Sequence, residues 1–329
     1  MLRKTCTALC LLISVPAWAQ TEAPAAAVAQ PDTVLVVGQR PGPGMWKISK
    51  GDNVLWVFAT YSPLPVKMQW RSQQVEAVIS QSQLYLSPPT LGASVGVWGG
   101  IKMLPHVVGM RKNPGGAMLR DVVSPEVYAR WRVLKAKYGV GDDAESERPV
   151  FAAETLYRAG LQHAGLATTD EVSKSIQAML TKNNVKVMNS HVQLDVPHPG
   201  KTLKEFKQSS MDDAACFKAT IDRLETDINV MRQRANAWSK GDLSEIRKLS
   251  FGDRVAACQS AIASSPALRD GLGLEGAEKR VRKLWLEAAE HALANYKTSF
   301  GMLKLGNVLR SDYVMTDLQA KGYTVQAPD

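Results

Sequence analysis

The histidines are the residues best suited to hold a metal ion, and the sequence keeps them apart. Of the five histidines, His191 and His198 come closest to a cluster, because they flank Asp195 in a segment that we expect to be a loop. A zinc site needs three or four converging ligands, and no two histidines here are three or four residues apart, as one helix face would require. We therefore expect an ordinary polar loop and no metal site.

Two glycine-rich segments invite a nucleotide-binding interpretation. Gly38, Gly42 and Gly44 follow the short apolar run 34–37, which could pair as an edge strand. Their spacing does not match Gly-x-Gly-x-x-Gly, two prolines intervene, and a second strand pattern follows where a phosphate-binding helix should begin. The segment 92–100, a predicted loop, lacks the Gly-Lys-Ser/Thr ending of a P-loop. No cofactor is predicted.

The first 19 residues have the three parts of an export signal. Arg3 and Lys4 precede the apolar run 8–15, and Ala-Trp-Ala ends the segment, so we predict cleavage between Ala19 and Gln20. No later stretch is apolar for long enough to span a bilayer, which predicts no stable membrane anchor after cleavage. The mature protein is therefore expected to be soluble and either periplasmic or secreted.

Cysteine content and charge fit an exported protein. Cys6 and Cys10 leave with the signal, so Cys216 and Cys258 remain alone in an oxidising compartment and are predicted to form a disulfide. Such a bond would stabilise the fold by about 4 kcal/mol through loop entropy. Loss of the two basic residues of the signal lowers the net charge from +9 to +7. This excess is spread along the chain, which indicates a solvated surface and no nucleic-acid partner.

The remaining chain divides into a lead-in and one domain. Residues 20–43 are rich in Ala, Pro and Gln, then in Pro and Gly, which predicts a flexible segment, and residues 44–329 form the domain. Strand patterns at 45–49 and 54–58 enclose a Gly- and Asn-containing turn and predict a hairpin. Further strands are expected at 84–86, 185–188 and 322–326, and further helices at 72–80, 150–161, 171–180 and 275–296.

Capping residues locate two other helical elements. Ser124 and Pro125 open a helix at 127–138, with Ser as N-cap and Pro in the first turn. One long helix is predicted over 212–238, followed by a turn at 240–241 and a helix capped by Asp242. The arms of this helical hairpin would bring the two cysteines together. Few strands and many helices predict an α+β fold, in which a small mixed β-sheet packs against several helices, including the long helical hairpin.

Four segments resemble the TraB/GumN family. Residues 44–62, GMWKISKGDNVLWVFATYS, are similar to its opening hairpin, whose second strand ends in Gly-Thr-x-His. Residues 120–131, 235–243 and 318–325 are similar to its helix start, helical-hairpin tip and C-terminal helix and strand. Their order and spacing match over most of the mature chain and favour the exported GumN-like branch, which is distantly similar to the Wnt-cleaving metalloproteases of animals.

The resemblance implies an α+β fold in which two Gly-x-x-His segments and a strand-end glutamate converge on a divalent ion for peptide hydrolysis. This sequence has Ser62 and Lys304 at the histidine positions, and Ser87 near the glutamate position. A hydroxyl is a poor ligand and an ammonium repels a cation. The substitutions therefore predict no bound metal and no catalytic residues of the family type.

Three hypotheses follow. The leading one is an exported, non-catalytic protein of the cell envelope that binds a peptide, protein or glycan. The alternative is a hydrolase or peptidase with a replaced active site, in which Lys304 acts as base to a Ser62 nucleophile, or with an unrecognised metal site. A third places Trp70, Arg71 and Trp98 at the rim of a ligand site formed by the glycine-rich residues 91–105.

Overall fold

The structure is a computed structural model that describes residues 42–66, 68–93, 105, 107–168, 171–194, 196–226, 228–249 and 254–328. The predicted signal peptide, the strand predicted at 34–37, nearly all of the lead-in, Asp195 and Trp98 lie outside the described residues.

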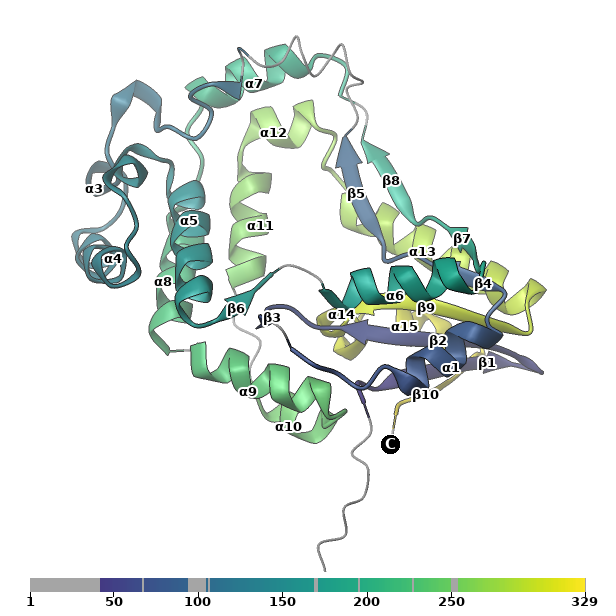
Figure 1. Cartoon of the computed structure of the whole chain (residues 1–329). Helices are drawn as coiled ribbons and strands as arrows, with labels where there is room; N and C mark the ends of the chain where they lie inside the picture. Colours follow the sequence, from purple (N-terminus) through teal and green to yellow (C-terminus); the bar gives the residue numbers. More distant parts are fainter. Residues whose placement is uncertain are drawn as a thin grey trace, which may run out of the picture. The chain divides into compact units, whose positions relative to one another are not determined.

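A mixed six-stranded sheet organises the domain (Figure 1). Its strands, in spatial order, are β10 (Thr324–Gln326), β1 (Met45–Lys50), β2 (Asn53–Thr60), β9 (Thr298–Lys304), β4 (Leu84–Leu86) and β7 (Lys186–Met188). The hairpin β1–β2 is antiparallel, as predicted, and Gly51 adopts a positive φ of 61° in its turn. The strands β2, β9, β4 and β7 run parallel to one another, so their carboxyl ends share one edge of the sheet.

Side chains alternate between two buried faces of these parallel strands. On one face, Phe58 and Tyr85 flank Phe300 with ring centroids 6.3 and 6.0 Å from it. On the other face, Leu55 and Leu86 lie beside Gly301, and helix α13 (Ala277–Asn295) covers them through Trp285. The sheet is therefore a central layer, and its middle strands are inaccessible from either side.

Strand β9 was not predicted, although it forms the centre of the sheet. Its residues are buried from Ser299 to Leu303, so the run shows no alternation of polar and apolar residues, and Gly301 interrupts it. A Cβ at Gly301 would lie 3.4 to 3.6 Å from Leu55, Trp285 and Leu86, which is ordinary van der Waals contact, so these neighbours pack closely around the glycine.

Two loop predictions are wrong at their first residues, because the segments after β4 and β7 form a second parallel pair; residues 94–100 of the predicted loop lie outside the described residues. This pair comprises β5 (Thr90–Ala93) and β8 (His191–Leu194). Gly92 and His191 therefore lie in strands rather than loops. A small pair, β3 (Leu64–Pro65) with β6 (Leu166–Ala167), was also not predicted. These strands are short, and their pairing depends on partners distant in sequence.

Three helices around the sheet, predicted at 72–80, 171–180 and 275–296, agree with the structure. Helices α1 (Gln73–Gln81) and α6 (Glu171–Lys182) lie next to each other in front of the sheet in Figure 1. Helices α14 (Leu305–Leu309) and α15 (Val314–Ala320) follow β9 and precede β10. Val75 of α1 and Ile176 of α6 belong to the same hydrophobic cluster as the strands, which we call the sheet core.

A second hydrophobic cluster, the helical core, lies among the helices between β5 and β9. Its centre includes Trp131 and Phe217, whose rings are 5.3 Å apart. The elements of this region are η1 (Pro114–Gly116), α3 (Leu119–Val122), α4 (Pro125–Tyr138), η2 (Asp142–Ser146), α5 (Pro149–His163), α7 (Pro199–Gln208), α8 (Ala214–Thr226), α9 (Ile228–Ser239), α10 (Leu243–Lys248), α11 (Arg254–Ser264) and α12 (Pro266–Gly271).

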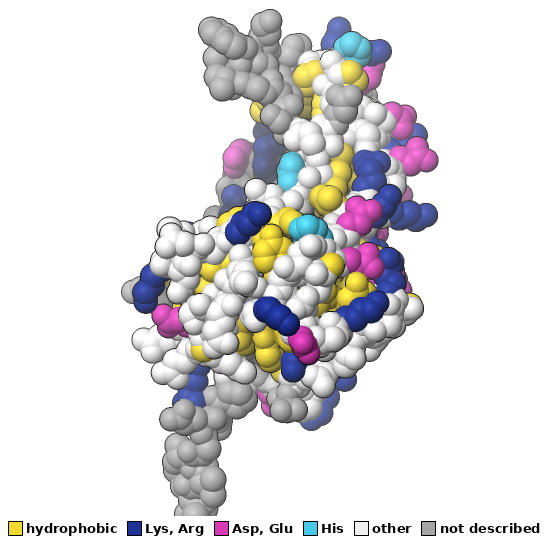
Figure 2. All heavy atoms as spheres, turned by 90° about the vertical axis from the view of Figure 1, so that its right-hand side faces the viewer, with side chains coloured by type: hydrophobic (Ala, Val, Ile, Leu, Met, Phe, Trp, Pro, Cys, Tyr) yellow, Lys and Arg dark blue, Asp and Glu magenta, His cyan; other side chains and the backbone are white. Residues whose placement is uncertain are grey.

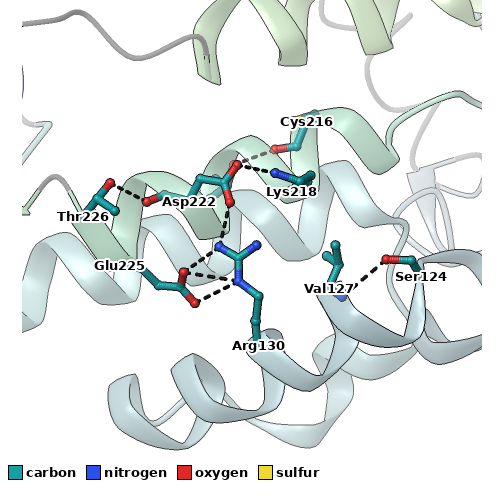
Figure 3. A network of polar contacts seen from close by, with 9 residues as sticks. Ser124, Val127, Arg130, Cys216, Lys218, Asp222, Glu225 and Thr226 are labelled. Atoms are coloured by element: carbon teal, nitrogen blue, oxygen red, sulfur yellow. Dashed lines mark hydrogen bonds and ion pairs between the residues drawn. The ribbon is translucent and has the colours of Figure 1, made fainter.

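Capping and ion pairs fix helix α4. Its predicted N-cap is confirmed, because the Ser124 hydroxyl accepts a hydrogen bond of 3.3 Å from the Val127 amide. Arg130 projects from α4 to helix α8, where it contacts Asp222 at 2.6 Å and Glu225 at 2.5 Å (Figure 3). This fork of charge-assisted bonds joins two helices of the helical core.

The prediction of one continuous helix over 212–238 is wrong, because the segment forms two helices. It consists of α8 and α9, which run in different directions in Figure 1. Phe217 and Leu224 of α8 are buried in the helical core, whereas Ala235 and Trp238 of α9 are buried in the sheet core. The segment must change direction to serve both cores, a tertiary demand that its helical periodicity does not reveal.

The tip of the hairpin is as predicted. Gly241 has a φ of 71°, and the Asp242 carboxylate accepts a bond of 2.9 Å from the Glu245 amide. Beyond the tip, α11 packs along α8, and the disulfide between Cys216 and Cys258 joins them across 42 residues of sequence. The predicted α+β fold, with its helical hairpin, is confirmed, and each arm of the hairpin contains two helices.

Candidate functional site: the carboxyl edge of the parallel strands

The three positions singled out by the resemblance lie at one edge of the sheet. Lys304 is the last residue of β9 and pairs in register with Thr60, the last residue of β2. Leu86, the last residue of β4, pairs with Gly301 on the other side of β9. Ser62 and Ser87 follow these strand ends by two residues and one residue. The parallel strands therefore bring the motif segments to a shared carboxyl edge.

Helix α9 holds the first motif segment in place. The Trp238 indole donates a hydrogen bond of 2.7 Å to the Ala59 carbonyl, and the buried Arg234 guanidinium donates one of 3.4 Å to the Tyr61 hydroxyl. Burial raises the pKa of Tyr61, and the hydrogen bond and positive charge of Arg234 only partly oppose this shift. Tyr61 is thus a neutral, anchored side chain beside the exposed Ser62.

Ser87 has a structural role at the second position. Its hydroxyl accepts a hydrogen bond of 2.8 Å from the Ser190 amide, and its own amide donates to the Met188 carbonyl at 3.0 Å. These bonds join the segment after β4 to the segment after β7. A side chain committed to a backbone amide in this way is poorly placed to bind a metal ion.

Lys304 and Ser62 are both exposed, and no hydrogen bond joins their side chains within the described chain. A lysine acts as base to a serine when burial removes it from water, because desolvation disfavours the ammonium form. The exposed position of Lys304 does not supply that environment. The geometry therefore gives no support to the predicted Ser62/Lys304 pair.

The residues at this edge do not fit the divalent ion that the resemblance implies. They supply an exposed hydroxyl, a hydroxyl already bonded to an amide, and an ammonium, in place of imidazoles and a carboxylate. Across the described residues, no three His, Cys, Asp or Glu side chains are grouped so that they could hold a metal ion.

The described histidines lie on different elements, and His191 is in a strand where a loop was predicted. His191 lies on β8, where its Nδ1 is 3.0 Å from the Thr90 hydroxyl, and His198 precedes helix α7. His163 packs on Tyr138, and His291 lies near Tyr296. Figure 2 shows the imidazoles on one face as separate spots among interspersed basic and acidic side chains.

The predicted aromatic rim is only partly described. Trp70 is half-buried, with its ring 5.7 Å from Phe58 and 6.5 Å from Trp238, so it packs on the sheet core while keeping an accessible side. Arg71 is exposed beside it. Because Trp98 lies outside the described residues, the rim stays a prediction.

Arg234 and Trp238 are functional-site neighbours that the sequence analysis did not identify. Met231, Arg234, Ala235 and Trp238 are buried at spacings of three and four residues along α9. An arginine within an otherwise apolar helical stripe was the available signal, since a buried guanidinium needs hydrogen-bond acceptors.

The fold and site define an α+β protein whose parallel-strand edge retains the convergence of three motif segments without a set of metal-binding side chains. The chain belongs to the TraB/PrgY/gumN family, whose sequence model matches residues 44–327. No curated protein and no solved structure shows significant similarity to it. In the described part of the chain, every helix is too short or too polar to cross a membrane.

Proposed function

We propose that this chain is an exported, non-catalytic member of its family that binds a peptide, protein or glycan of the cell envelope at the carboxyl edge. The observation that carries the proposal is the side-chain chemistry of that edge. Ser62, Ser87 and Lys304 replace the family's ligands at the ends of aligned parallel strands. Such a site can hydrogen-bond a ligand and attract its negative groups, but it lacks a metal-activated water.

The export part of the proposal rests on two independent observations, one from the sequence and one from the structure. The first 19 residues match a cleavable signal. The remaining two cysteines are joined in a disulfide, a bond that persists mainly in oxidising compartments.

A hydrolysis assay tests the non-catalytic part of the proposal. Fluorogenic peptides and unfolded casein are incubated with the mature chain in the presence of Zn²⁺ or Mn²⁺, in parallel with Ser62→Ala and Lys304→Ala. We expect no turnover above buffer for any of the three proteins. Turnover by the natural chain that both substitutions abolish would contradict the proposal and establish the Ser62/Lys304 hydrolase instead.

A thermal-shift screen tests the binding part. The natural chain is heated with acetylated peptides, muropeptides and neutral or acidic oligosaccharides, in parallel with Lys304→Glu and the control Arg247→Glu on α10. A ligand present at about a hundred times its dissociation constant should stabilise the folded chain by about 2.7 kcal/mol. We expect one class to raise the melting temperature of the natural chain and the control but not of Lys304→Glu. If no class stabilises the natural chain, or Lys304→Glu responds equally, the carboxyl edge is not the binding site.

A further inference from the structure

A groove of about 500 Å³ lies in the helical region, on elements different from those of the carboxyl edge. One wall follows helix α4 through Tyr128 and Arg132, which lie one turn apart on the same helix face. Met118 and Arg120, at the start of α3, form a second wall, and Val140 lies where the chain leaves α4 for η2. The volume falls within the range of sites that hold small ligands or short peptide segments.

The two acidic groups of the groove, Asp142 and Glu145, are both paired with Lys135. The Glu145 carboxylate is only 12% exposed and accepts hydrogen bonds from the Trp131 indole at 3.0 Å and from Lys135 at 2.8 Å. Burial raises the pKa of Glu145, but the bonds from Lys135 and Trp131 outweigh it and hold the pKa below its usual value. Lys135 also contacts Asp142 at 2.5 Å. Lys135 therefore compensates the buried Glu145, whereas the Asp142 side chain is 98% exposed and its charge is largely screened by solvent.

The two arginines of the groove, by contrast, have little compensation. Arg132 is exposed and makes no ion pair or hydrogen bond with the described residues. Among the residues that the structure describes, Arg120 approaches only Asp121, at 3.7 Å, and both of these side chains are largely exposed, so the pair contributes little. Two guanidinium groups on different walls thus face solvent with their hydrogen-bond donors available.

We propose that this groove binds an acidic peptide segment of a partner protein. Guanidinium groups bind carboxylates through paired hydrogen bonds, so Arg120 and Arg132 would hold two acidic side chains of the segment. The aliphatic side chains of Met118 and Val140 offer an apolar surface for a residue between them. The site is independent of the carboxyl edge and of the function proposed for it.

The walls favour a peptide over a glycan. Sugars commonly stack on open aromatic faces, whereas the aromatic residue lining this groove, Tyr128, is half-buried. The other apolar lining groups are aliphatic. A uronic-acid oligosaccharide could satisfy the arginines but would leave this apolar surface without a matching partner.

Fluorescence anisotropy of labelled, end-blocked peptides tests the proposal. The mature chain is titrated with Asp-Leu-Asp-Leu-Asp and with the neutral peptide Asn-Leu-Asn-Leu-Asn. We expect the acidic peptide to bind, the neutral peptide to bind at least about tenfold more weakly, and affinity to fall as salt is raised. Arg132→Glu and Arg120→Glu should each reduce affinity about tenfold or more, whereas the control Arg247→Glu should not.

A second measurement locates the binding site. Trp131 bonds to Glu145 beneath the groove, so its indole N–H resonance, assigned with Trp131→Phe, should shift when the acidic peptide is added. If Arg132→Glu disturbs folding, the milder variant Arg132→Ala replaces it in both measurements. Equal binding of the two peptides, unchanged affinity in both arginine variants, or an unmoved Trp131 resonance would overturn the proposal. Preferential binding of trigalacturonate over the acidic peptide would overturn it in favour of a glycan.

Discussion

The sheet core and the helical core differ in the polar groups that they bury. Among the described residues, Ser82, Ser190 and Ser299 are buried around the sheet strands, whereas Arg148 and Asp213 are buried beside the helical core. Backbone hydrogen bonds between strands set the register of the sheet, and one buried charged side chain, Arg234, contacts the segment after β2. The helices instead rely on particular charged side chains to fix their arrangement.

Arg148 illustrates this dependence. Its guanidinium donates to the carbonyls of Phe206 at 2.6 Å and Ser209 at 3.0 Å, where helix α7 ends. Asp213 accepts a bond of 2.9 Å from the Val150 amide at the start of α5. Each contact joins a helix end to a distant segment, and the helix dipole strengthens the arginine contact.

This difference between the sheet core and the helical core explains how a family member can lose its metal-binding side chains and keep its fold. The carboxyl edge is defined by hydrogen bonds between strands, so replacing side chains at the strand ends leaves their convergence intact. A corresponding loss in the helical region would remove contacts that hold helices together. We therefore expect the edge to tolerate substitution better than the helices do.

Removal of the disulfide should give the largest effect and should act mainly on the helices. The variant Cys216→Ala/Cys258→Ala releases a loop of 42 residues, which should lower the free energy of unfolding by about 4 kcal/mol. Hydrogen exchange should show lost protection in α8 and α11 and smaller changes in β2 and β9. Equal losses of protection in the helices and the strands would indicate one cooperative core and would contradict the distinction between the helical core and the sheet core.

Ser87→Ala should have a smaller effect, confined to the sheet. It removes the acceptor of the buried Ser190 amide and should cost about 2 kcal/mol in urea unfolding. Ser87→Thr keeps the hydroxyl and is the matched control. If alanine is tolerated without loss, Ser87 is not the structural link that we describe, and its position remains open for a ligand.

Asp213→Asn should give the smallest effect, visible as a change in pH dependence. Burial raises the pKa of Asp213, so the folded chain binds this proton more readily than the unfolded chain does. The natural chain should therefore lose stability, relative to the variant, as pH rises from about 4 through the raised pKa. A constant difference between natural chain and Asp213→Asn across this range would contradict the account.

Local signals in the sequence predicted much of this fold. The turn before Asn53, the Ser124–Pro125 helix start and the Asp242 cap each depend on a few adjacent residues, and the structure confirms them. Strand β9 and the change of direction between α8 and α9 depend on partners far along the chain. Their apolar patterns fit more than one structure, so the sequence did not distinguish them.

The candidate site was predictable to the same extent. The order of the motifs located Ser62, Ser87 and Lys304, although only the strands before Ser62 and Ser87 were predicted from the sequence. The bonds of Ser87 to the segment after β7, and the support of Tyr61 by Arg234, require the folded arrangement. The groove along α4 likewise combines residues from three elements, and no single stretch of sequence indicated it.

Metal content is the most direct test of the central claim, that the carboxyl edge has kept its geometry and lost its ligands. Elemental analysis would compare the purified natural chain with Ser62→His/Ser87→Glu/Lys304→His after exposure to Zn²⁺ or Mn²⁺, with circular dichroism confirming that both are folded. We predict no stoichiometric metal in the natural chain and about one ion per chain in the folded variant. Stoichiometric metal in the natural chain, or a folded variant that binds none, would contradict the account.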